Sequence, residues 1–282
     1  MIMQNSIKRF LKKIGLRFVR EKTIPVIIQT PFAKLLEGKT ALVTGGSSGI
    51  GLAIAQSIVA SGGKVIIAGR SEKRLKAVIK EMGEANVKSL VLDVSQPEEI
   101  HEKFNELVQH FSENEKIDIL VNSAGVHGNQ TFGTISQTDY DTIMNTNLRG
   151  LYFMCQEVAN YMKANRLKGN ILNISSASAL KPAWSPYEIS KWGVRGLTLG
   201  LARELIPYGI VVNGLAPGPT ATAMLQFTPG QGVNWPTNPS GRVATPEEVG
   251  GLAVYMLSNA GRYIVGDTFF ITGGSGTINI DK

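Results

Sequence analysis

The chain has 282 residues, of which 43% are hydrophobic and 18% charged, the composition of a globular protein with a sizeable core. Its formal net charge of +7 is unevenly placed, because nine of the 29 basic residues but only two of the 22 acidic ones precede Ala41. The remainder is neutral, which argues against a nucleic-acid-binding body. The single cysteine, Cys155, excludes an intrachain disulfide, and we expect no metal site. No apolar run reaches the roughly 18 residues that a membrane-spanning helix needs.

Residues 1–35 are predicted to form an N-terminal extension. The apolar residues that recur there at helical spacing are Ile7, Phe10, Leu11, Ile14 and Phe18. Lysines and arginines occupy much of the remaining surface, which predicts a basic amphipathic helix. Through residues 6–20 this helix could contact an anionic membrane surface, or its apolar stripe could dock on the protein body or on a neighbouring subunit. Its charges interrupt the apolar positions, so it is a poor signal peptide.

From Leu36 onward, short β-rich runs alternate with longer segments of helical periodicity, which is the pattern of repeated βαβ units. The runs are nearly all apolar, as in a parallel sheet covered by helices on both faces. We therefore expect residues 36–282 to form a single α/β domain with a Rossmann-type, doubly wound sheet of seven parallel strands. The strands are predicted at residues 39–44, 64–68, 89–93, 117–122, 170–175, 210–215 and 268–271, and the first helix at residues 49–60.

The first predicted strand runs into a glycine-rich turn, Thr44-Gly-Gly-Ser-Ser-Gly-Ile-Gly51, which opens the first helix. A strand, a glycine turn and a helix in this order are the context of a dinucleotide site. Without side chains at the glycines, the backbone can approach a pyrophosphate closely, and unpaired N–H groups at the helix start face its negative charge. The alternative is a structural turn in which Thr44 and Ser47 cap the helix.

Tyr187 and Lys191 lie four residues apart, about one helical turn, and so share a helix face. A free phenol has a pKa of about 10, and an ammonium beside it favours the phenolate, which tunes it as an acid/base. The spacing alone is weak evidence, because such pairs occur by chance in many helices. Downstream of a phosphate-binding turn, it predicts reversible hydride transfer.

These motifs resemble those of the short-chain dehydrogenase/reductase family, in particular its classical subgroup and enzymes of the 3-oxoacyl-[acyl-carrier-protein] reductase type. The family's signature Thr-Gly-x-x-x-Gly-x-Gly is matched from Thr44 to Gly51, and its Asn-Asn-Ala-Gly segment appears as Asn122-Ser-Ala-Gly125. The resemblance extends from about Leu36 to Ser275. The cofactor-binding residues that it implies are Gly45, Ser47, Ser48, Gly49, Ile50, Gly51, Arg70, Asp93, Val94, Asn122, Ala124, Gly125, Tyr187, Lys191, Pro217, Gly218, Thr220 and Thr222.

The resemblance also implies four catalytic residues, namely Asn147, Ser176, Tyr187 and Lys191. Tyr187 would exchange a proton with the substrate oxygen, and Lys191 would lower the pKa of Tyr187 and hold the nicotinamide ribose. Asn147 would hold a water that links Lys191 to solvent. Ser176 would hydrogen-bond the substrate oxygen.

The serine is closer to the tyrosine than is usual in the family, since Ser176 precedes Tyr187 by 11 residues. We therefore expect a shortened loop between them, with Ser175 and Ser178 as alternatives to Ser176. Pro186 suits the first turn of the helix that carries Tyr187.

Cofactor choice is indicated at the end of the second predicted strand. Gly69 stands where an acidic residue would bind the ribose 2′-hydroxyl of NAD, and Arg70 beside it offers a countercharge to a 2′-phosphate. The sequence therefore predicts NADP(H) in preference to NAD(H). The alternative is that Arg70 is a solvated residue at a helix entrance.

The substrate, a small carbonyl or alcohol compound, is expected over the nicotinamide beneath a lid of about residues 219–243. Met224, Leu225, Phe227 and Trp235 in this segment suggest a partly apolar pocket, although packing against the protein body would explain them equally well. His127 and Trp184 could line the cleft, and the alternative for His127 is a loop histidine without a chemical role.

Two function classes follow from these features. The first is an NADP(H)-dependent oxidoreductase that interconverts a carbonyl and a secondary alcohol, a homodimer or homotetramer in the cytoplasm or at the inner membrane surface. The second is a catalytically silent NADP-binding scaffold recruited through the N-terminal helix. The trio Asn147, Tyr187 and Lys191 favours the enzyme, because a scaffold has no physical need for it.

Overall fold

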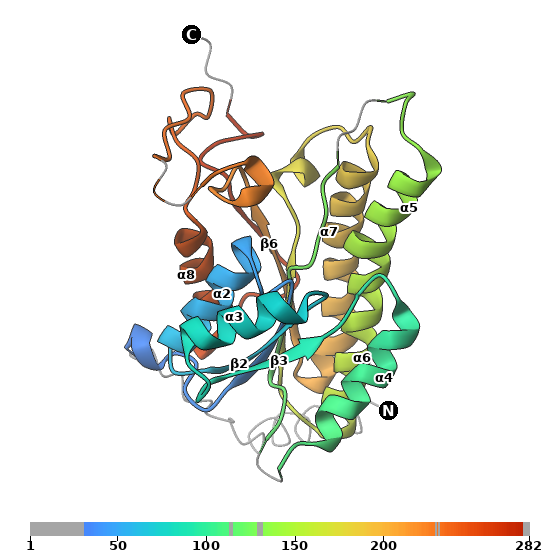
Figure 1. The fold of residues 1–282 in the computed structure, drawn as a ribbon, viewed down its shortest axis with the longest axis vertical. Helices are drawn as coiled ribbons and strands as arrows, with labels where there is room; N and C mark the ends of the chain where they lie inside the picture. Colours follow the sequence, from blue (N-terminus) through green and yellow to red (C-terminus); the bar gives the residue numbers. More distant parts are fainter. Residues whose placement is uncertain (1–30, 113–114, 129–131, 229, 231, 279–282) are drawn as a thin grey trace, which may run out of the picture.

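The computed structural model describes residues 31–112, 115–128, 132–228, 230 and 232–278. Its centre is a seven-stranded parallel sheet in the order β3-β2-β1-β4-β5-β6-β7 (Figure 1). The strands are β1 (Thr40–Thr44), β2 (Lys64–Gly69), β3 (Val87–Val91), β4 (Ile119–Asn122), β5 (Asn170–Ile174), β6 (Val211–Pro217) and β7 (Thr268–Ile271). The predicted doubly wound sheet is confirmed. The predicted helix over residues 6–20 lies outside the described residues.

Helices cover both faces of the sheet (Figure 1). One face is covered by α2 (Gly49–Ala60), α3 (Glu72–Met82) and α8 (Pro246–Leu257), and the other by α4 (Pro97–Gln109), α6 (Gly150–Ala164) and α7 (Pro186–Leu205). A fourth helix on this second side, α5 (Gln137–Met144), runs into α6 through a π-helical turn, Asn145–Arg149. The short 3-10 turns are Phe32–Lys34, Ala177–Leu180, Ile206–Tyr208, Ala223–Leu225 and Asn259–Gly261. Each face therefore has its own apolar core.

The edge strand β3 departs from the sequence prediction. It begins at Val87 instead of Ser89, and Lys88, Ser89 and Val91 are exposed. The expected burial on both faces was therefore wrong for this strand, because an edge strand has a neighbour on one side only. The central strands β1 and β4 have the expected continuous burial.

The strand order reverses between β1 and β4, since β1 pairs with β2 on one side and with β4 on the other. The helix that follows β1, α2, covers one face of the sheet. The connection that follows β4 includes α6, which covers the opposite face. A crevice opens at the carboxyl ends of strands where such connections diverge, and ligands of open α/β sheets bind there. Within the described residues, no helix is long and apolar enough to span a membrane.

Candidate active site

The turn between β1 and α2 depends on glycine at the predicted positions. Gly45 and Gly49 have φ angles of 67° and 55°, which side-chain-bearing residues rarely adopt. A Cβ atom at Gly45 would lie 2.9 Å from the backbone of Ala124, and one at Gly51 would collide with the carbonyl oxygen of Gly45. The turn can therefore press against both the helix start and the loop after β4.

Thr44 fastens this turn to the neighbouring loop. Its hydroxyl oxygen accepts the backbone N–H groups of Ser123 at 3.1 Å and Ala124 at 3.2 Å. The N-cap residue of α2 is Ser48, and no side-chain hydrogen bond caps the helix. The alternative in which Thr44 and Ser47 cap α2 is therefore wrong. The N–H groups at the start of α2 are left available to an anion, which fits the diphosphate of a dinucleotide.

One end of the crevice is a cavity over the carboxyl ends of β1, β2 and β3. Its walls include eight of the predicted cofactor-binding residues, namely Gly45, Ser47, Ser48, Arg70, Asp93, Val94, Ala124 and Gly125. Gly69, which stands at the position that indicates cofactor choice, lines it as well. Ser71, Arg74 and Thr146 also line it and were not predicted. Arg74 lies in the first turn of α3, four residues after Arg70 and just beyond the end of β2, so its position in the sequence could have indicated it. Two arginines and no carboxylate except that of Asp93 make this end of the crevice suitable for a phosphate.

At the other end of the crevice, Tyr187 lies at the start of α7. Pro186 occupies the first turn, as predicted, and a capping box fixes the helix start. The Ser185 hydroxyl accepts the N–H group of Glu188 at 3.4 Å, and the Glu188 carboxylate accepts the N–H group of Ser185 at 3.2 Å. The rigid start of α7 sets where the phenol points.

Lys191 lies one turn further along α7, with its ammonium nitrogen 5.7 Å from the centroid of the Tyr187 ring. The side chain is 6% exposed, and the ammonium donates a hydrogen bond to the Ile174 carbonyl oxygen at 3.0 Å. Among the described residues no carboxylate forms an ion pair with it. Burial lowers the pKa of Lys191 to about 8.

The pKa of the Tyr187 phenol is raised above its ordinary value. Burial is the largest cause; a hydrogen bond with Ser176 acts in the opposite direction, and the charge of Glu188 raises the pKa further. This direction is opposite to the one expected from Lys191. The lysine is itself desolvated and donates to a backbone carbonyl, so its effect does not offset the burial of the phenol.

The two adjacent serines after β5 have different partners. Ser175 is buried, and its hydroxyl donates to the Lys191 carbonyl oxygen at 2.9 Å. Ser176 accepts the N–H group of Ser178 at 3.1 Å and is the serine that hydrogen-bonds Tyr187. The geometry therefore favours Ser176 as the partner of the phenol.

Asn147 lies in the π-helical turn and is fully buried. Its side-chain amide exchanges two hydrogen bonds with the backbone of Val126, at 2.8 and 2.9 Å, and donates a third to the Ser190 hydroxyl at 3.2 Å. A Cβ atom placed on Gly125 would lie 3.3 Å from the Asn147 Oδ1 atom and 3.7 Å from the Lys191 Nζ atom. Asn147 therefore supports the floor of the crevice beside the lysine.

Asn122 also lies beneath the crevice and does not line it. Its amide donates to the Asn173 Oδ1 atom at 3.0 Å and to the Cys155 Sγ atom at 3.1 Å. Burial raises the pKa of the Cys155 thiol to about 12, so this cysteine is inert near neutral pH.

The remaining predicted residues meet at the substrate end of the crevice. A cavity there is lined by Ile50, Ser176, Tyr187, Pro217, Gly218, Thr220 and Thr222, together with His127, Lys181, Met224, Leu225 and Ser275. The His127 ring lies 4.5 Å from the Tyr187 ring, between centroids. Lys181 and Ser275 were not predicted. Between the two ends lies a third cavity, which shares Gly45 and Gly125 with the first and Tyr187 and Thr222 with the second.

The site has the parts of a dinucleotide-dependent α/β oxidoreductase. These are a glycine turn with an uncapped helix start, a crevice at the reversal of strand order, and a Tyr/Lys pair at the end of that crevice. The family model for short chain dehydrogenase matches residues 39–231. The chain belongs to this family, whose members use a nicotinamide cofactor, and it is therefore an oxidoreductase.

Three relatives illustrate the range of the similarity. A 3-oxoacyl-[acyl-carrier-protein] reductase of Thermotoga maritima is 34% identical over 245 residues, covering 85% of this chain and 98% of the relative. The structure of a gluconate 5-dehydrogenase from Burkholderia cenocepacia with NADP and tartrate superposes with a TM-score of 0.80 at 29% identity, covering 88% and 99%. A 3-ketoacyl-(acyl-carrier-protein) reductase from Brucella melitensis complexed with NADH has a TM-score of 0.76 at 29% identity, covering 86% and 99%.

Proposed function

We propose that the protein interconverts a carbonyl and a secondary alcohol with NADP(H), using Tyr187 as the general acid/base. The observation that carries the proposal is that Tyr187 lines two adjoining cavities and that its phenol hydrogen-bonds Ser176, which lines the second of them. One cavity opens toward the glycine turn and the other toward the lid segment, so Tyr187 lies between the dinucleotide site and the substrate site.

The bound nicotinamide supplies the hydride during reduction and accepts it during oxidation. In the reductive direction the Tyr187 hydroxyl donates its proton to the substrate oxygen, and the Ser176 hydroxyl donates a hydrogen bond to the same oxygen. In the oxidative direction the phenolate takes the proton back. The raised pKa keeps Tyr187 protonated near neutral pH, as a proton donor requires.

In this proposal Lys191 and Asn147 assist Tyr187 without contacting the substrate. The buried ammonium of Lys191 stabilises the phenolate that proton donation leaves. The Asn147 Oδ1 atom, which accepts one hydrogen bond from Val126, has a second lone pair for a water between it and Lys191. Through that water the site would recover its proton from solvent.

The preference for NADP(H) over NAD(H) rests on the cavity at the β2 end. Gly69 leaves space, and Arg70 and Arg74 supply two positive charges at the wall. The named relatives with bound cofactor contain NADP in one case and NADH in the other, so the cofactor choice has to come from these residues.

Replacing Tyr187 by phenylalanine removes one hydroxyl and tests the mechanism. General acid–base catalysis contributes about 10² to 10⁴ in rate, so we expect Tyr187→Phe to lose activity by that factor while it still binds NADPH. NADPH absorbance with a panel of ketones, keto acids and 3-oxoacyl thioesters gives the rate, and fluorescence titration gives the binding. Tyr208→Phe, on the exposed turn after α7, is the matched control. Full activity of Tyr187→Phe would refute the proposed role.

The silent scaffold has no observation in its favour, since Asn147, Ser176, Tyr187 and Lys191 are brought together.

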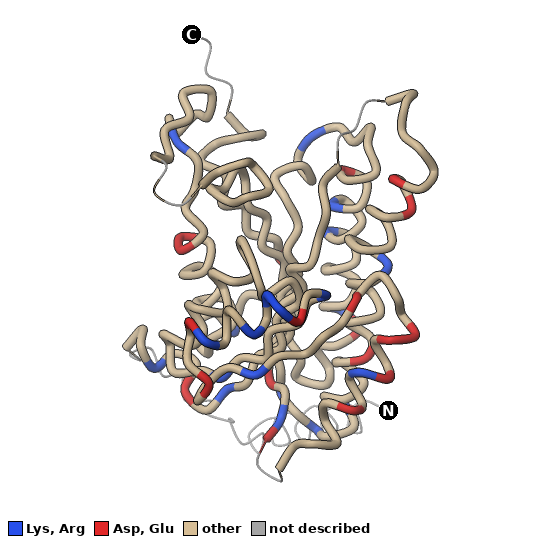
Figure 2. The backbone as a smooth tube through the Cα atoms, in the orientation of Figure 1, with Lys and Arg blue, Asp and Glu red and all other residues tan. Residues whose placement is uncertain are grey.

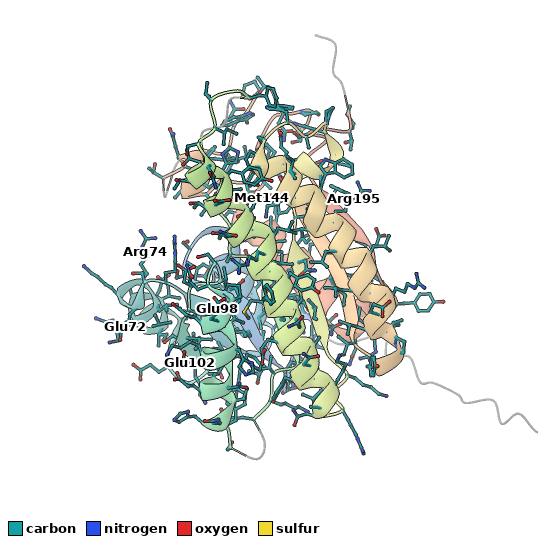
Figure 3. All side chains as sticks on the ribbon, turned by 90° about the vertical axis from the view of Figure 1, so that its right-hand side faces the viewer. Glu72, Arg74, Glu98, Glu102, Met144 and Arg195 are labelled. Atoms are coloured by element: carbon teal, nitrogen blue, oxygen red, sulfur yellow. The ribbon has the colours of Figure 1, made fainter. Side chains whose placement is uncertain are left out.

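Assembly into a homodimer or homotetramer remains part of the proposal. Exposed Ile189, Trp192 and Leu199 lie on α7, which runs beside α6 on the side seen in Figure 3. Sedimentation velocity tests this, and a mass of 30.4 kDa, that of a single chain, would contradict it.

Location in the cytoplasm, and contact of residues 6–20 with the inner membrane surface, likewise remain proposals. The lone cysteine is buried and free, which suits a reducing compartment. Co-sedimentation with anionic liposomes, with and without residues 1–30, tests the membrane contact. Equal pelleting of both forms would contradict it.

A further inference from the structure

The cavity at the substrate end has a charge pattern that proton transfer does not need. Among the described residues that line it, two are basic, Lys181 and His127, and none is an aspartate or glutamate. Most of its other polar groups are hydroxyls, on Ser176, Ser178 and Ser275 among others. Charged residues are sparse in the loops of the upper part of Figure 2.

Lys181 is held in place by its backbone and by its stem. Its N–H group donates to the Ser178 carbonyl oxygen at 3.2 Å, and its carbonyl oxygen accepts the indole N–H group of Trp192 at 2.8 Å. Its Cε atom lies 3.2 Å from the position that a Cβ atom on Gly276 would take, so the stem packs along the segment that follows β7. The loop after β5 and this C-terminal segment therefore present Lys181 together.

Lys181 forms no ion pair with any carboxylate in the part of the chain that the structure describes. The acid nearest along the chain is Glu188, whose carboxylate accepts the backbone N–H groups of Trp184 at 3.1 Å and Ser185 at 3.2 Å in the α7 capping box. An unpaired cation at a cavity wall attracts an anionic ligand and orients it.

Building on the proposed function, we propose that the substrate is a hydroxy acid, or the corresponding keto acid, whose carboxylate is bound by Lys181. The reacting carbon then lies at Tyr187, and the carboxylate is remote from it. The serine and threonine hydroxyls of the cavity suit further hydroxyl groups on the substrate, while Met224 and Leu225 cover its carbon skeleton.

A matched pair of ligands isolates the carboxylate. D-gluconate and D-glucitol differ only in having a carboxylate or a CH₂OH group at C1, and neither is oxidised by enzyme loaded with NADPH. Isothermal titration calorimetry of the NADPH-loaded protein should show tighter binding of gluconate. Lys181→Met, which keeps the apolar stem, should weaken gluconate binding about tenfold, as expected for losing a charge-assisted hydrogen bond, and leave glucitol binding unchanged. Lys80→Met, at the exposed end of α3, should change neither.

Equal binding of the two ligands by the parent protein, no binding of either, or gluconate binding that Lys181→Met leaves unchanged would each overturn the inference. Turnover distinguishes this failure from failure of the proposed function. 5-keto-D-gluconate and L-sorbose differ in the same C1 group, and NADPH oxidation reports on each. Equal kcat/KM for both would reject the carboxylate site but support the oxidoreductase. Absence of turnover with every carbonyl compound would reject the proposed function itself.

Discussion

Gly69 ends β2 at the wall of the cavity that we assign to the ribose of NADP(H). A Cβ atom there would lie 3.3 Å from the Ser47 hydroxyl and would not collide with backbone, so a side chain fits after a small shift of Ser47. We expect Gly69→Asp to lower the ratio of kcat/KM for NADPH to that for NADH by at least about tenfold. The new carboxylate would repel a 2′-phosphate and accept a hydrogen bond from a 2′-hydroxyl.

Gly69→Ala is the control for this change, because it adds the Cβ atom without the charge. Steady-state kinetics with both cofactors should give it the parent's preference. An unchanged preference in Gly69→Asp would contradict the assignment of this wall to the 2′-phosphate.

Single residues were predictable from the sequence where one short motif contains the chemistry. The spacing of Tyr187 and Lys191 and the glycine turn belong to this class. Lys181 does not, because its place in the substrate cavity depends on a C-terminal segment about 95 residues away in the chain. The direction of the Tyr187 pKa shift was also missed, since it depends on burial, which the spacing to a lysine does not reveal.

At the scale of an element, α7 offers a test of how helix capping positions the site. Its capping box, Ser185 with Glu188 and a proline in the first turn, has a close counterpart in α8, Thr245 with Glu248 and Pro246. Loss of an N-cap hydroxyl costs about 0.5 to 2 kcal/mol of stability. We expect both Ser185→Ala and Thr245→Ala to lose that amount in chemical denaturation. Only Ser185→Ala should also lower kcat, because Tyr187 lies in the first turn of α7.

Thr245→Ala thus separates loss of stability from loss of position. If both variants retain full kcat, or lose it equally, the cap of α7 has no special part in orienting the phenol. The comparison is best made well below the melting temperature of either variant, so that both are folded during the assay.

The elements themselves were largely predictable because their apolar runs and breaks are local. The first helix was predicted with the bounds observed, Gly49–Ala60, and the last strand likewise, Thr268–Ile271. The predicted position of β3 was two residues too late, because an exposed edge strand lacks a strong apolar signal. The π-helical turn at Asn147 was not predictable, since the propensities of its residues do not distinguish it from the α-helices on either side.

For the whole molecule, the buried ammonium of Lys191 reduces the free energy of unfolding. A pKa lowered from 10.5 to about 8 means that the unfolded chain retains this proton between pH 8 and pH 10.5, where the folded chain has released it. Stability therefore rises with pH across this range, and the full penalty, on the order of 3 kcal/mol, applies below pH 8.

Lys191→Met removes this penalty together with one hydrogen bond to Ile174. We expect the melting temperature of the variant, relative to that of the parent, to be most favourable and constant from pH 7 to about pH 8, and then to decline up to pH 10. Differential scanning calorimetry at intervals of one pH unit measures the difference. A constant difference across the range would mean that Lys191 titrates in the folded protein as it does in water.

The same lysine couples ligand binding to the uptake of a proton. A ligand whose oxygens or negative charge meet the Lys191 Nζ atom restores the ammonium, because its charge then has a partner. Above pH 8 such a ligand must be taken up together with a proton from solvent, so its affinity declines as the solution becomes more alkaline. The crevice would therefore bind its cofactor and a hydrogen ion as a coupled pair, and the protein would release both together.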